Sequence, residues 1–271
     1  MFRLLFIGFS VLLSSKVFTQ TIGSVGARSA SMANASVAIS DSWSYYTNPG
    51  ALADIRKFAV GISYENRFLL KELQTQGLVS IQPIKVGVLS FGTQFSGLDI
   101  FRTSKLGMGY SLKLSDYLFV GVQLNYQTFR FLSNYGKQSC VTAETGIYMK
   151  LSKDWRIGVS IFNLGRTFLS RSLDERVSTV MRLGSKYSFS SHLFVLMEAE
   201  KNINYPLRLK TGIEYQPNEK FMIRGGVATK PIEITFGLGY KFSCFQLDLG
   251  SAYYQLIGWS PHCSLTYKLD N

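Results

Sequence analysis

Hydrophobic and polar residues alternate along most of this chain with a period of two. In residues 118–126 the even positions carry Leu, Val or Tyr, while glycine and side-chain amides occupy most of the odd positions. The stretches 156–162, 208–215, 234–242 and 246–254 repeat the pattern. Since successive side chains of a β-strand point to opposite faces, the pattern predicts strands with one apolar face and one polar or glycine-bearing face.

Such strands occur both in membrane barrels and in soluble sandwiches. The predicted strands are about ten residues long or longer, which is the length of a tilted bilayer crossing. Tyr and Phe recur near the strand ends, as in the interfacial girdles of membrane barrels. We therefore predict an all-β fold, an antiparallel transmembrane β-barrel. Its aliphatic side chains contact lipid, and its glycines and charged side chains face an enclosed lumen.

Turn signals between the predicted strands give their number. Short polar turns are expected at Pro83, Ser115-Asp116, 152–154, 190–192, 217–219 and near Ser243-Cys244. A second kind of connection is expected at 69–72, 97–103, 132–138, 168–176, 201–207, 229–232 and 256–261, and none of these is long. The six turns and seven connections join fourteen strands. Both termini then lie on the short-turn side, which is the periplasmic side of an outer-membrane barrel.

The N-terminal region divides into two segments before the first predicted strand. Residues 1–19 read as a cleaved signal peptide, because Arg3 precedes a short apolar run from Leu4 to Leu13. Residues 20–55 begin with many small side chains and continue into aromatic residues. A fourteen-stranded barrel is too wide for its own side chains to fill. We therefore predict that 20–55 form a short, partly helical plug and that 56–271 form the barrel.

Composition narrows the choice of partners and chemistry. The chain has 29 Lys and Arg against 17 Asp and Glu, a net charge of +12 at pH 7. The basic residues are spread along the chain, so we expect outer-membrane lipid and lipopolysaccharide as partners, and no nucleic acid. Three cysteines without metal-site spacing and two histidines give no candidate metal, cofactor or catalytic centre. We expect no enzymatic activity.

The stretch GARSASMANASVAISDSWSYYTNPGALA, residues 26–53, resembles the N-terminal hatch of FadL-type outer-membrane proteins, and most of all the PorV/PorQ branch of Bacteroidetes-like bacteria. The shared features are the G-A-R opening, an acidic residue at Asp41 and an N-P-x-x-L step at 48–52. The chain departs from the family at Ala33-Asn34, where Gly-Gly is common, and at Gly50, where Ala is frequent. It also ends in Leu-Asp-Asn and not in an aromatic residue.

The resemblance implies a fourteen-stranded barrel with an N-terminal plug in the cell outer membrane. It implies one of two roles. The main expectation is an accessory component of type IX secretion or surface-protein handling, with secretion-machinery proteins as partners. The alternative is a FadL-like passive transporter of hydrophobic small molecules across the outer membrane. A second alternative, from a different class, is a structural scaffold whose lumen is permanently filled.

Three groups of residues are candidates for the site. The plug residues are Arg28, Met32, Asp41, Trp43, Tyr45, Tyr46, Asn48, Pro49 and Gly50. Asn48-Pro49-Gly50 is either a functional latch or a capped, helix-ending turn. The plug aromatics either line an apolar ligand channel or wedge the plug against the wall.

The other two groups lie in the barrel. Phe68, Leu69 and Leu70 stand at the first outward turn and serve either as a contact for lipid or a partner, or as interfacial anchors. The predicted lumen lining consists of Arg156, Lys210, Glu214, Lys241 and Asp248. These charges form either a selectivity lining or a set of compensating ion pairs.

Overall fold

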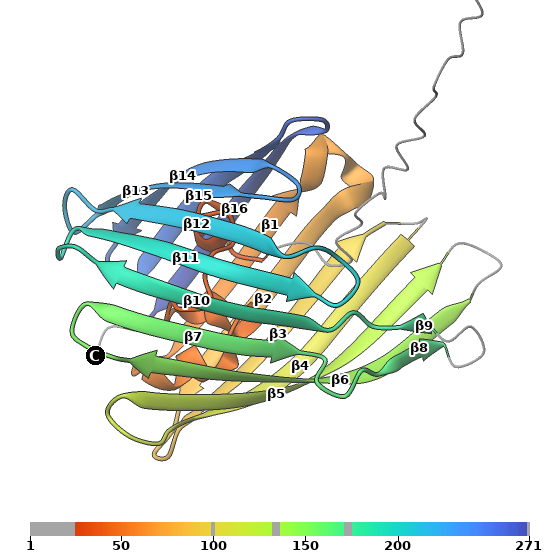
Figure 1. The fold of residues 1–271 in the computed structure, drawn as a ribbon, viewed down its shortest axis with the longest axis horizontal. Helices are drawn as coiled ribbons and strands as arrows, with labels where there is room; N and C mark the ends of the chain where they lie inside the picture. The colour runs from red at the N-terminus through yellow and green to blue at the C-terminus, as the bar shows by residue number, and fades with distance from the viewer. Residues whose placement is uncertain (1–24, 99–100, 132–135, 171–174, 270–271) are drawn as a thin grey trace, which may run out of the picture.

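Fourteen antiparallel strands close into a barrel in the computed structural model, which describes residues 25–98, 101–131, 136–170 and 175–269 (Figure 1). Strands β1 to β7 are Ala59–Asn66, Gln74–Pro83, Val88–Gly97, Phe101–Lys113, Leu118–Phe131, Lys137–Lys150 and Trp155–Phe162. Strands β10 to β16 are Val180–Ser188, Leu193–Asn202, Arg208–Tyr215, Phe221–Ala228, Glu233–Phe242, Phe245–Tyr254 and Gly258–Lys268. The predicted fold class is confirmed. The predicted signal peptide lies outside the described residues.

Sequence neighbours pair around the barrel, β7 pairs with β10, and β1 pairs with β16 to close the ring. All six predicted short turns join strands at one end, which we call the turn end. The other connections lie at the opposite end, which we call the loop end. The chain enters β1 and leaves β16 at the turn end, as the turn pattern predicted.

The loop between β7 and β10 differs from the prediction of uniformly short connections. It contains a small two-stranded sheet made of β8, Phe168–Ser170, and β9, Glu175–Arg176. Asn163, directly after β7, is hydrogen-bonded to the far part of this loop. Its side-chain amide donates to the carbonyl of Val177, and its backbone carbonyl accepts from the hydroxyl of Thr179. The loop between β1 and β2 is short and forms two single turns of 3-10 helix, η3 at Arg67–Leu69 and η4 at Lys71–Leu73.

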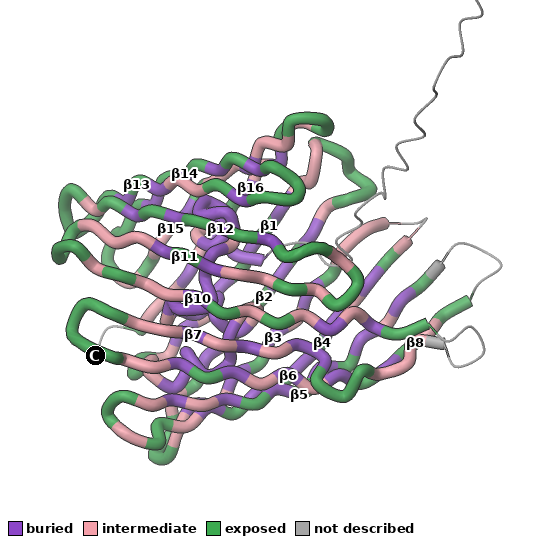
Figure 2. The backbone as a smooth tube through the Cα atoms, viewed as in Figure 1, coloured by how far each residue is buried: buried purple, intermediate pink, exposed green. Residues whose placement is uncertain are grey.

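The strands alternate between an outward apolar face and an inward polar or glycine face. In β5, Val122, Leu124 and Tyr126 are exposed, while Gln123 and Asn125 are fully buried. Figure 2 shows this alternation as a change of colour along each strand. Exposed aromatic residues gather near the turn end, among them Tyr117, Tyr187, Phe189, Tyr215 and Phe221. This distribution agrees with the predicted interfacial girdle.

The plug, residues 25–55, lies inside the barrel (Figures 1 and 2). It consists of one helical turn, α1 at Ala27–Ala30, and two 3-10 helices, η1 at Ser42–Tyr46 and η2 at Pro49–Asp54. Most of its side chains are buried, including Met32 and Tyr45, which have no exposed surface. No helix in the described part of the chain is long and apolar enough to cross a membrane.

Candidate functional site: the plug and the lumen around it

Local hydrogen bonds fix the shape of the plug. Asp41 caps η1, because its carboxylate accepts from the backbone N–H groups of Trp43 and Ser44 at 2.9 and 3.1 Å. The Ser44 hydroxyl accepts in turn from the Asp41 N–H, which completes a capping box. Asn48 caps η2 in the same manner by accepting from the N–H of Gly50 at 3.0 Å, with Pro49 in the first turn.

A ring of inward-facing glycines brings the barrel wall into direct contact with the plug. A Cβ atom built at any of them would lie less than 3.0 Å from a plug atom. We call this set the glycine girdle: Gly61, Gly77, Gly92, Gly107, Gly121, Gly146, Gly158, Gly184, Gly212, Gly226, Gly237 and Gly250. The girdle visits every barrel strand except β11 and β16. The lumen is therefore filled by contact between plug and backbone, with no layer of wall side chains between them at these positions.

The three plug aromatics pack against the wall. Trp43 lies over Gly61, and Tyr45 lies over Gly92. The hydroxyl of Tyr45 donates to the carbonyl of Gly92 at 3.2 Å, while that of Tyr46 lies 2.8 Å from the carbonyls of Leu78 and Thr93. Burial raises the pKa of both tyrosines above its ordinary value, so both hydroxyls stay protonated as donors. In this arrangement the aromatics wedge the plug.

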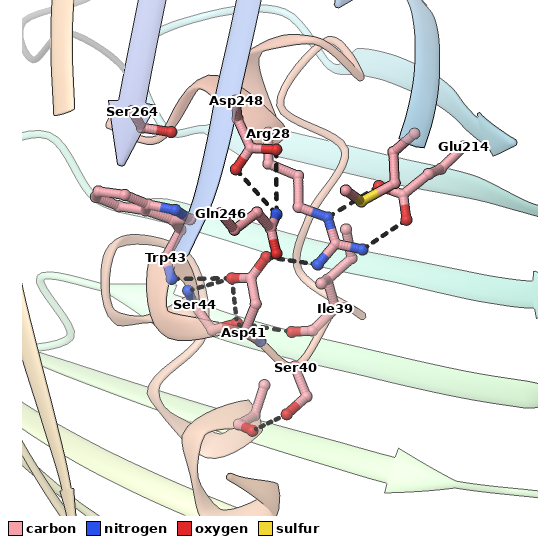
Figure 3. A network of polar contacts seen from close by, with 12 residues as sticks. Arg28, Ile39, Ser40, Asp41, Trp43, Ser44, Glu214, Gln246, Asp248 and Ser264 are labelled. Atoms are coloured by element: carbon pink, nitrogen blue, oxygen red, sulfur yellow. Dashed lines mark hydrogen bonds and ion pairs between the residues drawn. The ribbon is translucent and has the colours of Figure 1, made fainter. Parts of the chain in front are cut away.

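An ionic network ties the first half of the plug to β12, β13 and β15 (Figure 3). Arg28 donates two hydrogen bonds to Glu214 at 2.8 and 2.9 Å and a third to Asp41 at 3.1 Å. Glu214 also accepts from Arg224, which donates to Asp248 at 2.7 Å. Burial alone would lower the pKa of Arg28, but the charges of Glu214 and Asp41 outweigh burial and raise it. The guanidinium is therefore held as a cation between two carboxylates.

The opposite wall contacts the plug through Asn48-Pro49-Gly50. The Asn48 amide donates to the plug carbonyl of Val37 at 2.7 Å and to the wall carbonyl of Ile147 at 3.0 Å. The hydroxyl of Ser111 donates to the carbonyl of Pro49 at 2.7 Å. The tripeptide is thus both a capped turn and a point of attachment to β4 and β6.

The first residues of the plug bind the seam where the barrel closes. The N–H of Gly26 donates to the Ser63 hydroxyl of β1 at 3.0 Å, and the N–H of Ala27 donates to the Ser264 hydroxyl of β16 at 3.2 Å. Ser63 and Ser264 are paired across the seam. The plug therefore bridges the first and last strands of the barrel.

Toward the loop end, the side of the lumen that β4 to β7 line becomes apolar, whereas the opposite side keeps buried charged residues, among them Glu65, Arg208 and Glu233. Lys105 and Glu144 form a buried ion pair at 3.6 Å beside the plug, and the Lys105 Nζ lies 5.1 Å from the ring centre of Phe162. Beyond this pair comes a buried apolar cluster of Phe129, Cys140, Phe162 and Val177, which Phe101, Leu169 and Val180 extend. We call this the loop-end apolar cluster. The loop that carries β8 and β9 contributes Leu169 and Val177 to it.

The predicted lumen lining divides between the interior and the turn end. Lys210 donates to Glu198 at 3.0 Å and to Glu200 at 2.7 Å, so it joins an ion-pair cluster of its own. Arg156 instead donates to two carbonyls of the 151–154 turn, and Lys241 is exposed at the turn end. A hollow of about 370 Å³ lies at the turn end between the plug and the wall, with Arg156 in its lining.

The residues at the first loop divide in their exposure. The Phe68 ring packs edge-on against Tyr254, with 5.2 Å between ring centres, and its N–H donates to Ser260. Leu69 and Leu70 are exposed at the loop end. The prediction that these residues contact lipid or a partner remains untested.

Sequence reasoning named Lys210 but missed its partners Glu198 and Glu200, and it also missed Arg224, the Lys105–Glu144 pair and the Arg208–Glu233 pair. Each of these residues occupies an inward position of an alternating strand. These residues could therefore have been found from the alternation, because charged residues at the inward positions of a strand face the lumen. Their partners could not be read from the alternation, because pairing depends on the register and on the seat of the plug.

The sequence matches no protein-family model and no curated protein. The fold is similar to several solved channels. The CymD monoaromatic hydrocarbon channel shares 13% identity at a TM-score of 0.72, over 93% of this chain and 99% of that one. The toluene transporter TbuX of Ralstonia pickettii shares 12% at 0.67, over 90% and 98%. A FadL homologue of Pseudomonas aeruginosa shares 12% at 0.66, over 92% and 99%. At these identities the likeness concerns the fold.

Proposed function

We propose that this protein is a passive transporter of hydrophobic small molecules across the outer membrane. The turn end faces the periplasm and the loop end faces outward, because the chain enters the first barrel strand and leaves the last one at the turn end. The observation that carries the proposal is the loop-end apolar cluster, a buried apolar site inside a barrel whose fold is similar to hydrocarbon channels. The proposed transport involves no catalysis and needs no cofactor.

The plug sets the kind of solute that can pass. Within the described residues it fills the lumen down to the backbone of the glycine girdle, so the plug occupies the path that water and ions would take. A small apolar molecule gains free energy by leaving water for an apolar surface. The loop-end apolar cluster gathers buried apolar side chains close to the outside, beside the loop of β8 and β9, and in this proposal the ligand binds among them when they part. The ligand enters there and leaves when the plug shifts or the wall opens.

The test uses N-phenylnaphthylamine, a hydrophobic probe that fluoresces once it has crossed the outer membrane of intact cells. Cells that produce the protein should take up the probe faster than cells with an empty vector, while uptake of a polar β-lactam stays the same. The variant Phe162→Glu places a charge in the apolar cluster and should return probe uptake to the vector level. Leu256→Glu, at a loop position that is 95% exposed, is the control.

Cells that produce the unmodified chain, Phe162→Glu or Leu256→Glu must carry the same amount of heat-modifiable barrel for the comparison to hold. Probe uptake at the vector level in cells with the unmodified chain would overturn the proposal. Full uptake by Phe162→Glu would refute the role of the apolar cluster.

The glycine girdle favours a second candidate, a scaffold whose lumen is permanently filled. Close contact between plug and backbone on twelve strands opposes plug movement. A scaffold predicts vector-level probe uptake together with a fully folded barrel. The PorV/PorQ resemblance of residues 26–53 and the accessory role in type IX secretion that it implies stay predictions from the sequence. Co-purification with secretion proteins from the native outer membrane would test that role.

A further inference from the structure

Charged side chains are distributed unevenly between the two faces of the barrel wall. Every Asp and Glu within the fourteen barrel strands occupies an inward position. Only four Lys or Arg residues of these strands occupy outward positions: Arg102, Arg130, Lys137 and Lys201. The outward face is therefore free of acidic side chains along the strands and carries a few isolated positive charges.

Three of these four cations lie side by side at the loop end. Arg102 of β4 pairs in register with Arg130 of β5, and Arg130 pairs with Lys137 of β6. All three are exposed, and within the described residues none of them has an ion pair or a side-chain hydrogen bond. Like charges directly opposite one another on neighbouring strands are destabilising. The cluster is therefore a candidate site for an anion.

Between the three cations and the turn end, the outward side chains of β4, β5 and β6 change from polar to apolar in the same order as the parts of a lipid molecule. One outward position closer to the turn end, Ser104, Thr128 and Ser139 lie in register across the same three strands, and the two hydroxyls of Thr128 and Ser139 are 3.2 Å apart. The next outward rows are apolar, with Leu106, Tyr126 and Val141 followed by Met108, Leu124 and Ala143. From the rim downward the wall thus presents cations, then hydroxyls, then an apolar surface.

A hollow with a mixed polar and apolar lining adjoins the cations on the side of β2 and β3. It measures about 230 Å³ and is lined by Gln74, Gln76, Phe95, Gly97, Leu98 and Arg102. Gln76 is exposed at an outward position of β2. Most outward positions of the wall carry apolar side chains, so a side-chain amide is unusual there. Amide groups next to cations suit a sugar that carries a phosphate.

We propose that Arg102, Arg130 and Lys137 bind the phosphate groups of a phosphorylated glycolipid of the outer leaflet, of the lipid A type. The guanidinium groups supply bidentate hydrogen bonds to phosphate. The hydroxyl row and the hollow face the sugar, and the apolar rows face the acyl chains. This site depends on the outward orientation of the loop end and is independent of transport through the lumen.

The test is native mass spectrometry of the full chain in detergent micelles, with diphosphoryl lipid A as the probe. The unmodified protein should retain the lipid, and R102Q/R130Q/K137Q should lower its affinity about a hundredfold, because each cation near an anionic lipid contributes to binding. The variant K201Q removes the fourth outward cation and should bind like the unmodified chain. Heat-modifiable migration confirms that each variant is folded.

Two further probes separate the possible sources of the anion. Lipid A without phosphate should bind about as weakly to the unmodified chain as diphosphoryl lipid A does to the triple variant. Inorganic phosphate at millimolar concentration should leave the bound lipid in place. Retention of lipid A by the folded triple variant, equal binding of the dephosphorylated lipid, or displacement by inorganic phosphate would each overturn the proposal. Probe uptake by cells tests transport separately.

Discussion

Glycines contact the plug on opposite walls of the barrel, but the polar contacts that accompany them differ between the two walls. On the wall of β12, β13 and β15, Arg28 joins a buried network of carboxylates and a second guanidinium. On the wall of β5 and β6, Asn48 and Gly50 meet wall backbone through an amide and through glycines. The one described ion pair between the plug and that wall, Asp54 with Lys150, lies near the turn end, where both side chains are partly exposed.

The difference teaches how the two attachments would fail. A buried ionic network is costly to break, because removal of one partner leaves another charge unpaired in a place without water. A contact between glycine backbones depends on shape and fails when a single carbon atom is added. The wall of β12, β13 and β15 therefore adds a few ionic contacts to its glycine contacts, while the wall of β5 and β6 sets the position of the plug mainly through the absence of side chains.

Deletion of residues 21–54 removes both attachments and should have the largest effect. The emptied lumen of a fourteen-stranded barrel is wide enough for water and ions. We expect conductance in planar bilayers to rise from background, for the full chain, to discrete open steps for the deletion variant. Background conductance from a correctly folded deletion variant would mean that wall side chains alone seal the lumen.

Arg28→Met breaks the charged attachment and should have the next largest effect. The substitution leaves Asp41 and Glu214 without the cation between them, at a cost of about 3 kcal/mol. The midpoint of heat-modified migration should fall accordingly. Arg156→Met serves as the control, because that guanidinium binds turn carbonyls at the turn end. An equal fall for both variants would argue against the network.

Gly146→Ala tests the wall of β5 and β6. Its Cβ would lie 2.0 Å from the Asn48 Oδ1, so the plug must move, at a cost of about 1 to 3 kcal/mol. Gly225→Ala is the matched control on an outward face, where the Cβ would lie 3.7 Å from the nearest atom, the carbonyl oxygen of Thr235. The same thermal measurement should separate the two variants, and identical midpoints would refute the close contact.

Asn48→Ala sharpens the comparison and should have the smallest effect. It removes the cap of η2 and the hydrogen bond to Ile147, for a loss of about 1 to 2 kcal/mol in the same thermal measurement. Asn48→Asp keeps the cap but cannot donate to the two carbonyls. If the Asn48→Asp variant were as stable as the unmodified chain, only the cap would matter.

The barrel could be predicted from the sequence because its signals are local. Alternation gave the face of each side chain, and turn residues such as Pro83 and Ser115 gave the fourteen strands. The resemblance of residues 26–53 located the plug segment. Inward glycines were visible as part of the alternation, but their purpose was not, since only the seated plug shows that they make room for it.

The pairing inside the lumen could not be predicted. Arg28 and Glu214 are far apart in the chain, and their contact depends on how the plug turns after Gly26. The loop between β7 and β10 was expected to be short, but it contains a separate small sheet, next to which Asn163 forms hydrogen bonds with Val177 and Thr179. Both results come from tertiary contacts that leave no periodic trace in the sequence.

The bridge from Gly26 and Ala27 to Ser63 and Ser264 has a consequence for the order of assembly. A segment in contact with backbone all around cannot be threaded easily into a finished cylinder. We infer that the N-terminal segment takes its place while the sheet is still open, and that the last strand then pairs with the first around it. At that stage Ser63 and Ser264 bind the N-terminal segment from both sides of the seam. The segment that fills the lumen therefore also helps to close the barrel.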